Sequence, residues 1–199
     1  MLERVLVIGS TGNIGVSAVK GALQAGRQVL AIVKAGKLPA FQHVYASVGG
    51  EYTNVPLKSI TTERLRKNMN MSLEASFFAY RDTIEYLLEQ NHPDSTWTIC
   101  TGSQGDMAIF ALPAITQGPL FSMATAAARE NEKTNVRVNE VYLMFRVEYD
   151  EDAAKHGVIS SSEFAAVYEG ILSNPEIRSS RVRVASPADI KDLKWAKKF

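Results

Sequence analysis

Three glycines spaced three residues apart lie near the start of the chain, and this spacing suits the binding of a diphosphate. Residues 9–15 read GSTGNIG; they follow an apolar run and lead into a helical pattern. The first glycine permits a tight turn, the second lets a pyrophosphate approach the backbone, and the third lets the helix pack closely, while free N–H groups at the helix start face the anion. A purely structural glycine turn is the alternative. The expected dinucleotide contacts are Gly9, Ser10, Thr11, Gly12, Asn13, Ile14 and Gly15.

Two lysines follow the next apolar run, residues 28–33, where a dinucleotide-binding strand usually ends in an acidic residue. Lys34 comes directly after the run and Lys37 close behind, with no Asp or Glu before Glu51. An acidic residue there would bind the ribose hydroxyls of NAD, whereas a cation can meet the 2′-phosphate of NADP. The sequence therefore favours NADP over NAD, with Lys34 as the contact. A solvated lysine is the alternative.

The other residue types that carry chemistry are sparse. The three histidines, His43, His92 and His156, lie far apart without metal-ligand spacing, so no metal site is expected. The single cysteine, Cys100, has no histidine close in sequence that could act as its base. We therefore expect a buried structural thiol at this position.

The elements that would position these groups alternate between strands and helices. Apolar runs rich in β-branched residues predict the strands, and the spacing of apolar residues together with capping residues predicts the helices. This alternation predicts an α/β fold with a mostly parallel sheet, in a single domain that spans residues 1–199. The expected strands are 5–8, 28–33, 43–48, 96–100, 136–145 and 181–184, and the expected helices are 14–24, 61 or 62 to 90, 120–130 and 160–173.

The composition limits the class of protein. The 199 residues are 46% hydrophobic and 22% charged, with a net charge of +1, which predicts a globular chain without a field for nucleic acid or anionic membranes. We expect no signal peptide and no membrane span. One cysteine suits a reducing compartment, so a cytoplasmic location is expected. The basic C-terminal residues are interpreted as a solvated tail; they are Lys191, Lys194, Lys197 and Lys198.

Five segments, in order along the chain, resemble the short-chain dehydrogenase/reductase family. They are IGSTGNIG (8–15), ASVGG (46–50), NMNMS (68–72), TICTGS (98–103) and NVRVNEV (135–141). The resemblance implies a Rossmann-like doubly wound parallel sheet with helices on both faces. It also implies oxidation or reduction of alcohols and carbonyls with a nicotinamide cofactor. Gly49, within the segment that stands for the family's Asn-Asn-Ala-Gly, joins the expected cofactor contacts.

The catalytic end of the site departs from the family pattern. The family uses a Tyr, a Lys four residues later that lowers the pKa of the Tyr, and a Ser, but none of the seven tyrosines here has such a Lys. Counting back from the sixth strand places the pair at Pro113 and Gln117, and a rival register places it at Phe121 and Thr125. The remaining candidates are Asn70 as the family's water-anchoring helix Asn, Thr101 or Ser103 in the serine role, and Gln117 in place of the Lys.

A second departure is a short link between the second and fourth strands of the family pattern. The family places a helix, a strand and another helix there, whereas this chain has only residues 34–42. An extended link can still cross to the next parallel strand. We therefore expect the usual third strand to be absent, either in a naturally shortened member or because residues are missing from the chain.

Three functions compete for this combination. The first is an oxidoreductase with a rebuilt site in which Ser103 or Thr101 polarises a small substrate and water donates the proton. The second is a non-redox isomerase or cyclase, and the third is a catalytically silent nucleotide-binding or regulatory protein. Family members associate through the helix containing Asn70 and the helix near Leu120, so the resemblance implies a homodimer or homotetramer.

Overall fold

Seven strands form one sheet in the computed structural model, which describes residues 3–31 and 39–199. The strand order is β2-β1-β3-β4-β5-β8-β9, and all neighbours are parallel except β8 and β9. The strands are β1 (Arg4–Ile8), β2 (Gln28–Ala31), β3 (His43–Ala46), β4 (Ser95–Gly102), β5 (Val136–Leu143), β8 (Ser180–Val184) and β9 (Lys194–Lys197).

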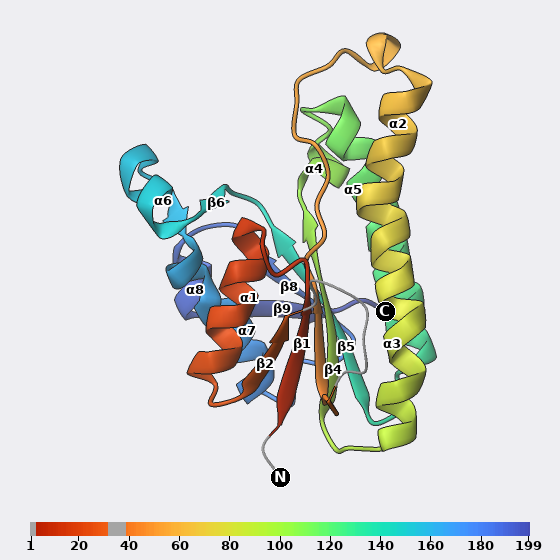
Figure 1. Ribbon diagram of the computed structural model, residues 1–199, viewed down its shortest axis with the longest axis vertical. Coiled ribbons are helices and arrows are strands. Elements are labelled where there is room, and N and C mark those ends of the chain that lie inside the picture. The colour runs from red at the N-terminus through yellow and green to blue at the C-terminus, as the bar shows by residue number, and fades with distance from the viewer. Residues whose placement is uncertain (1–2, 32–38) are drawn as a thin grey trace.

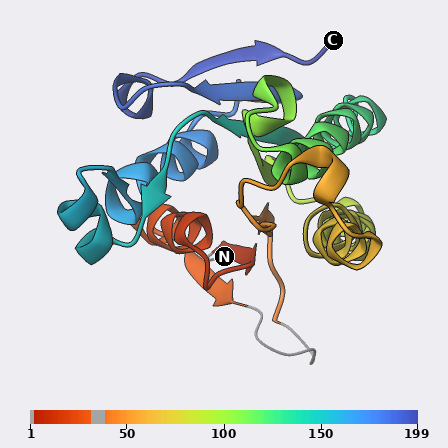
Figure 2. The same ribbon diagram turned by 90° about the horizontal axis from the view of Figure 1, so that it is seen from above.

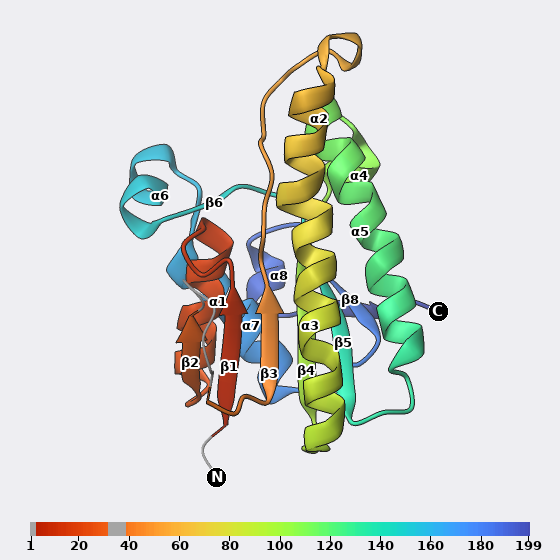
Figure 3. The ribbon, with the colours of Figure 1, turned by 45° about the vertical axis from the view of Figure 1, so that its right-hand side comes forward.

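Helices cover both faces of this sheet (Figures 1 and 2). On one face lie α1 (Asn13–Gln24) and α7 (Ser161–Ser173), which pack against each other. On the other face, α2 (Thr62–Met69) continues through a π-helical turn (Asn70–Glu74) into α3 (Ala75–Gln90), beside α5 (Ala111–Glu130), as Figure 3 shows. This arrangement confirms the expected Rossmann-like doubly wound architecture.

The sheet buries apolar side chains on both faces because both are covered by helices. Val5 and Val7 of β1 pack into the core that contains Phe164 of α7, whereas Leu6 between them packs into the core that contains Leu120 of α5. Side chains of a strand alternate between the two faces, so a central parallel strand needs an unbroken apolar run. This is why the run at residues 5–8 predicted a buried strand.

The short link leaves β2 at the edge of the described sheet. Only β1 pairs with β2, and β3 follows directly on the other side of β1. The expected absence of the third strand is therefore confirmed within the described residues. Lys34 and residues 35–38 lie outside the part of the chain that the structure describes.

Two helix starts follow the expected capping residues. Thr61 caps α2, because its side chain accepts a hydrogen bond from the Arg64 amide. Ser160 caps α7 in a capping box, in which Glu163 also bonds back to the Ser160 backbone. Both boundaries are confirmed.

The predicted helix at 120–130 is too short. Helix α5 begins at Ala111 and contains both Pro113 and Pro119. Pro113 lies in the first turn, where its missing N–H has no helical partner to lose. Pro119 lies inside the helix, and packing of the buried face, which includes Leu120 and Ala124, holds the helix together across it.

The C-terminal lysines are exposed as expected except for Lys198, but they do not belong to a free tail. Residues 194–197 form β9 along β8, and the Lys198 ammonium contacts the carboxylate of Glu140, whose side chain is fully buried. Arg181 donates to the same carboxylate over 3.0 Å. The buried carboxylate of Glu140 on β5 thus holds the end of the chain against the sheet.

Several short elements were not predicted. They are α4 (Gln104–Met107), α6 (Asp150–His156), α8 (Ala188–Lys191), a 3-10 turn (Leu57–Ser59), and a small parallel pair, β6 (Val147–Glu148) with β7 (Ile159–Ser160). Helix α6 has sequence signals: acidic residues in its first turn, basic residues in its last turn, and Gly157 in the left-handed conformation after it. No helix in the described part of the chain has the length and apolar character needed to cross a bilayer.

We predict that Lys198→Ala lowers the free energy of unfolding by about 2 kcal/mol. This is less than the loss of about 3–5 kcal/mol for a lone buried pair, because Arg181 still faces Glu140. Lys194→Ala is the matched control; its ammonium pairs with Asp192 at the surface and should contribute less than about 1 kcal/mol. Urea unfolding measures both, and equal midpoints for the two variants would contradict the buried contact.

Candidate functional site

A cleft of about 800 Å³ opens at the carboxyl ends of the central strands. Its walls come from the loops after β1, β3, β4 and β5, together with α5 and β6. Ligands of open parallel sheets bind at this edge, where the chain crosses to opposite sides of the sheet after neighbouring strands. Here that point lies between β1 and β3, because β1 leads to β2 on one side while β3 lies on the other.

The glycine turn after β1 is built on two very close backbone approaches. Gly9 has a φ of +82°, and a Cβ atom there would lie 2.6 Å from the Ser47 carbonyl oxygen. A Cβ atom on Gly15 would lie 1.9 Å from the Gly9 carbonyl oxygen. Neither position can carry a side chain, so the residue types at both ends of the turn are fixed by contact.

The start of α1 is open toward the cleft. Gly12 is its N-cap and supplies no side-chain cap, and the first turn contains no acidic residue. The first helical bond runs from Val16 to Gly12, so the amides of residues 13–15 precede it, and Gly12, Asn13 and Ile14 line the cleft. Free amides and the positive end of the helix dipole attract an anion. These residues fit the diphosphate of a dinucleotide.

The other expected cofactor contacts differ in whether they line the cleft. Gly49 lines the cleft, and nothing lies within 4 Å of the position of a Cβ atom there. Ser10 and Thr11 belong to the turn but are not among the lining residues, and the Thr11 carbonyl accepts a hydrogen bond from Tyr149. Lys34 lies outside the described residues.

Three of the four expected catalytic residues meet in the cleft. Gln117 is buried on α5, and its Oε1 accepts a hydrogen bond of 2.9 Å from the Gly102 amide. Ser103 is buried at the end of β4, and its amide donates to the Leu143 carbonyl. The Thr101 hydroxyl instead donates over 2.6 Å to the buried Glu140 carboxylate, which leaves Ser103 as the freer hydroxyl.

Asn70 does not reach the cleft. Its side chain is exposed in the π-helical turn and donates to Glu74 over 2.9 Å. The buried amide of this helix is Asn68, which accepts a 2.7 Å bond from the Glu51 amide. Asn68 and Asn70 are two positions apart and so lie on nearly opposite faces of the helix, and it is Asn68 that faces inward. Asn68 therefore holds the loop that follows β3.

Two registers are possible for the absent Tyr and Lys, and of their four positions Gln117 lines the cleft. Pro113 is buried, and Gln117 of the first register lines the cleft. Phe121 of the rival register packs against Gly105 and Tyr142, and Thr125 bonds to the Phe121 carbonyl. The assignment of Gln117 to the place of the absent Lys stays a prediction, and its position in the cleft wall is compatible with it.

Two cleft residues were missed by the sequence analysis. Tyr52 reaches in from the loop after β3, and its hydroxyl lies 3.1 Å from the position of a Cβ atom on Gly102. Glu148 of β6 also lines the cleft; it is buried, pairs with Arg146 and contacts His156 Nδ1 at 2.6 Å. No sequence motif marked either residue, because Tyr52 lies in a loop and Glu148 in the two-residue strand β6, and the fold sets the course of both segments.

The charged residue next to Tyr52 in the chain already has an ion-pair partner. The adjacent Glu51 is paired with Arg64 of α2, whose hydrogen bond, with one from Thr53, holds the pKa of Glu51 at about 2. The rest of the cleft lining mixes polar and apolar side chains; its larger apolar side chains are Ile14, Val48, Phe110, Leu143, Met144 and Phe145.

Comparison with known proteins finds a full-length relative. The chain is 43% identical to Short-chain dehydrogenase/reductase iacG of Pestalotiopsis fici, across 100% of this chain and 97% of the relative. The aligned region of 242 residues exceeds the 199 of this chain, so the relative carries residues that this chain lacks. No protein-family model matches the chain.

Solved structures share the fold. An oxidoreductase of the short-chain dehydrogenase/reductase family from Burkholderia thailandensis superposes with a TM-score of 0.77 at 17% identity, covering 92% of this chain and 91% of that one. A 3-ketoacyl-(acyl-carrier-protein) reductase from Brucella melitensis, complexed with NADH, has a TM-score of 0.76 at 12% identity, covering 94% and 98%. At these identities the likeness establishes the architecture alone.

We predict that Cys100 reacts slowly with thiol reagents. Burial raises the pKa of this cleft-lining thiol to about 12, so the reactive thiolate is scarce at neutral pH. Relative to an ordinary cysteine, reaction with Ellman's reagent near pH 8 should be roughly a thousandfold slower. Protein unfolded in guanidinium chloride is the control and should react at the ordinary rate; equal rates for folded and unfolded protein would contradict the burial.

Proposed function

The chain belongs to the short-chain dehydrogenase/reductase family, and from this premise we propose that it binds a nicotinamide dinucleotide in the cleft and interconverts a small carbonyl compound and its alcohol. The observation that carries the proposal is the open start of α1. Its uncapped amides face the cleft, and no carboxylate lies in the first turn to repel a diphosphate.

Different residues along the cleft bind different parts of the cofactor and the substrate. Gly12, Asn13 and Ile14 bind the diphosphate, and Gly49 leaves room for the sugar and base that continue from it. The nicotinamide ring, when bound, exchanges an electron pair with the substrate carbon. The Ser103 hydroxyl is available to hold the substrate oxygen at the end of β4.

The lining of the cleft favours an uncharged substrate. Glu148 and Arg146, the charged side chains among the described lining residues, pair with each other. A charged substrate would therefore gain no free counter-ion in exchange for the hydration that it loses on entering the cleft. We propose a small, uncharged ketone or aldehyde as the substrate, with its alcohol as the product.

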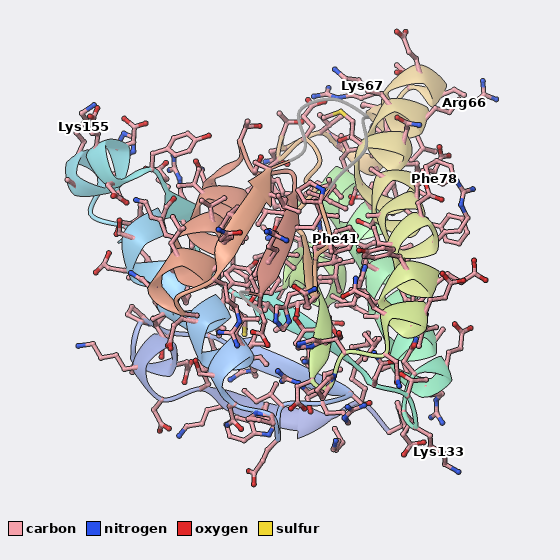
Figure 4. The ribbon with its side chains drawn as sticks, turned by 60° about the horizontal axis from the view of Figure 1, so that its bottom comes forward. Phe41, Arg66, Lys67, Phe78, Lys133 and Lys155 are labelled. Carbon is pink, nitrogen blue, oxygen red and sulfur yellow. The ribbon has the colours of Figure 1, made fainter. Side chains whose placement is uncertain are left out.

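Three finer features are also part of the proposal. Lys34 and Lys37, with no acidic residue before Glu51, support NADP over NAD. Exposed aromatic side chains on α3 support association into a homodimer or homotetramer through this helix; Phe77 and Phe78 are 46% and 40% exposed, and Figure 4 shows Phe78 pointing away from the helix. The single cysteine supports a cytoplasmic location.

We predict that Gly12→Asp weakens NADPH binding by about 100-fold or more. The new carboxylate would sit at the uncapped helix start beside the diphosphate, where like charges repel strongly. Gly12 has a φ of −85°, and a Cβ atom there meets only the Gly9 carbonyl at an ordinary 3.7 Å, so the fold should tolerate the change. Enhancement of nicotinamide fluorescence during titration measures the affinity.

Gly12→Ala is the matched control and should bind within several-fold of the unchanged protein. Unchanged affinity in Gly12→Asp would refute the diphosphate assignment. A panel of uncharged ketones and aldehydes, followed by NADPH oxidation at the same protein concentration, then tests the redox reaction. Binding without turnover across the panel would instead favour a silent or non-redox protein.

A further inference from the structure

The loop after β3 brings a phenol to the wall of the cleft at the end of β4. Tyr52 follows Gly50 by two residues, and its hydroxyl lies 3.1 Å from the position of a Cβ atom on Gly102. The absence of a side chain at Gly102 therefore makes room for the phenol. Tyr52 is 54% exposed overall, which keeps its ring in contact with solvent while its hydroxyl reaches the cleft wall. Within the described residues its hydroxyl has no hydrogen-bond partner.

A second donor lies against the same wall. Gln117 Oε1 lies 3.8 Å from the same Cβ position on Gly102 and accepts the bond from the Gly102 amide. Because a backbone amide only donates, this contact fixes the orientation of the side-chain amide. The Nε2 donors of Gln117 are thereby left for the cleft that this residue lines. Two neutral donors, one phenolic and one amidic, thus converge on one corner of the cleft.

We propose that Tyr52 is the proton donor of the reaction, with the Gln117 side-chain amide as the second hydrogen-bond donor to the substrate oxygen. The inference rests on the proposed function. As the carbonyl carbon gains a C–H bond, with both electrons supplied by the reduced nicotinamide cofactor, the C–O π pair moves to oxygen and takes the Tyr52 proton. The alcohol and the oxidised cofactor result. The Tyr52 phenolate oxygen then recovers a proton from water, which can enter because Tyr52 is half exposed at the cleft.

The groups around Tyr52 determine its protonation state, and that state determines whether it donates or accepts a proton. Burial of the hydroxyl, with the nearby Cys100 thiol, raises the pKa of Tyr52 to about 12, and no lysine lines the cleft among the described residues to lower it. The other titratable groups near this corner are Glu51, paired with Arg64, and Glu148, paired with Arg146 and His156. The phenol therefore stays protonated at neutral pH, as reduction of a carbonyl requires.

Oxidation of the alcohol has the opposite requirement, because Tyr52 must then accept the proton as a phenolate. Below a pKa of about 12 the phenolate fraction rises tenfold with each pH unit. The kcat/KM for alcohol oxidation should therefore rise about tenfold per pH unit between neutrality and about pH 10, while carbonyl reduction lacks this rise. This slope should disappear in Tyr52→Phe, and a slope that persists in the variant would assign the proton to another group.

The deciding experiment compares the unchanged protein with Tyr52→Phe and with Tyr86→Phe. Tyr86 packs against Phe41 outside the cleft and controls for loss of a phenolic hydroxyl. Isotope-edited infrared spectroscopy of carbonyl-13C acetophenone, bound with NADP, reports hydrogen bonding to the carbonyl oxygen without any reaction. We expect a lowered carbonyl stretch in the unchanged protein and in Tyr86→Phe, and a shift to higher frequency in Tyr52→Phe.

Kinetics complete the test. The kcat for reduction of the best ketone in the panel should fall about 100-fold in Tyr52→Phe, within the range for loss of a general acid, with NADPH affinity unchanged. Equal carbonyl frequencies in the unchanged protein and Tyr52→Phe, no bound carbonyl band at all, or a rate within twofold would overturn the inference. Failure of the unchanged protein to bind NADPH would instead overturn the proposed function, together with the inference that rests on it.

Discussion

The contact between the two ends of the glycine turn is the constraint on which the site depends. A Cβ atom at Gly15 would overlap the Gly9 carbonyl at 1.9 Å, so the backbone can leave β1 and enter α1 this tightly only with glycine in place. The tight turn aims the first amides of α1 along the carboxyl edge of the sheet. A looser turn could still lead into a helix, but the positive end of the helix dipole would then not point along this edge of the sheet.

The rest of the cleft follows from strand order. β1 and β3 are neighbours although a helix and β2 separate them in the chain, so the loop after β3 returns over the glycine turn. Its Ser47 carbonyl forms one side of the close approach at Gly9, and its Tyr52 crosses to β4 at Gly102. Asn68 holds this loop from α2 through the Glu51 amide. Residues distant in sequence thereby share one wall.

Strands, caps and the phosphate-binding turn were predictable because their signals are local. The run at residues 5–8, the glycines of residues 9–15 and the capping box at Ser160 each depend on neighbours within a few positions. The long α5 and the terminal β9 were not predictable locally: α5 is held across Pro119 by buried packing, and β9 is held by pairing with β8 and by the Glu140 charge. Asn70 was misplaced because the likeness of residues 68–72 to the family pattern does not show which side chain faces inward; in the structure that is Asn68.

The sequence located the glycine turn at the cleft, whereas it located the catalytic candidates there only in part. The family pattern located Gln117 and Ser103 in the cleft through its spacing along α5 and β4. It gave no place to Tyr52, which lies in the loop after β3 just beyond segment 46–50, the part that resembles the family pattern. The cleft thus lacks the usual Tyr and Lys pair, and its phenol comes from the loop after β3.

Amide resonances of 15N-labelled protein, followed by NMR during titration with NADPH, test the central claim most directly. The account predicts that the amides of Asn13, Ile14 and Gly15 show the largest and earliest shifts, because their hydrogens meet the diphosphate. Saturable binding that leaves these three resonances in place while others move would contradict it.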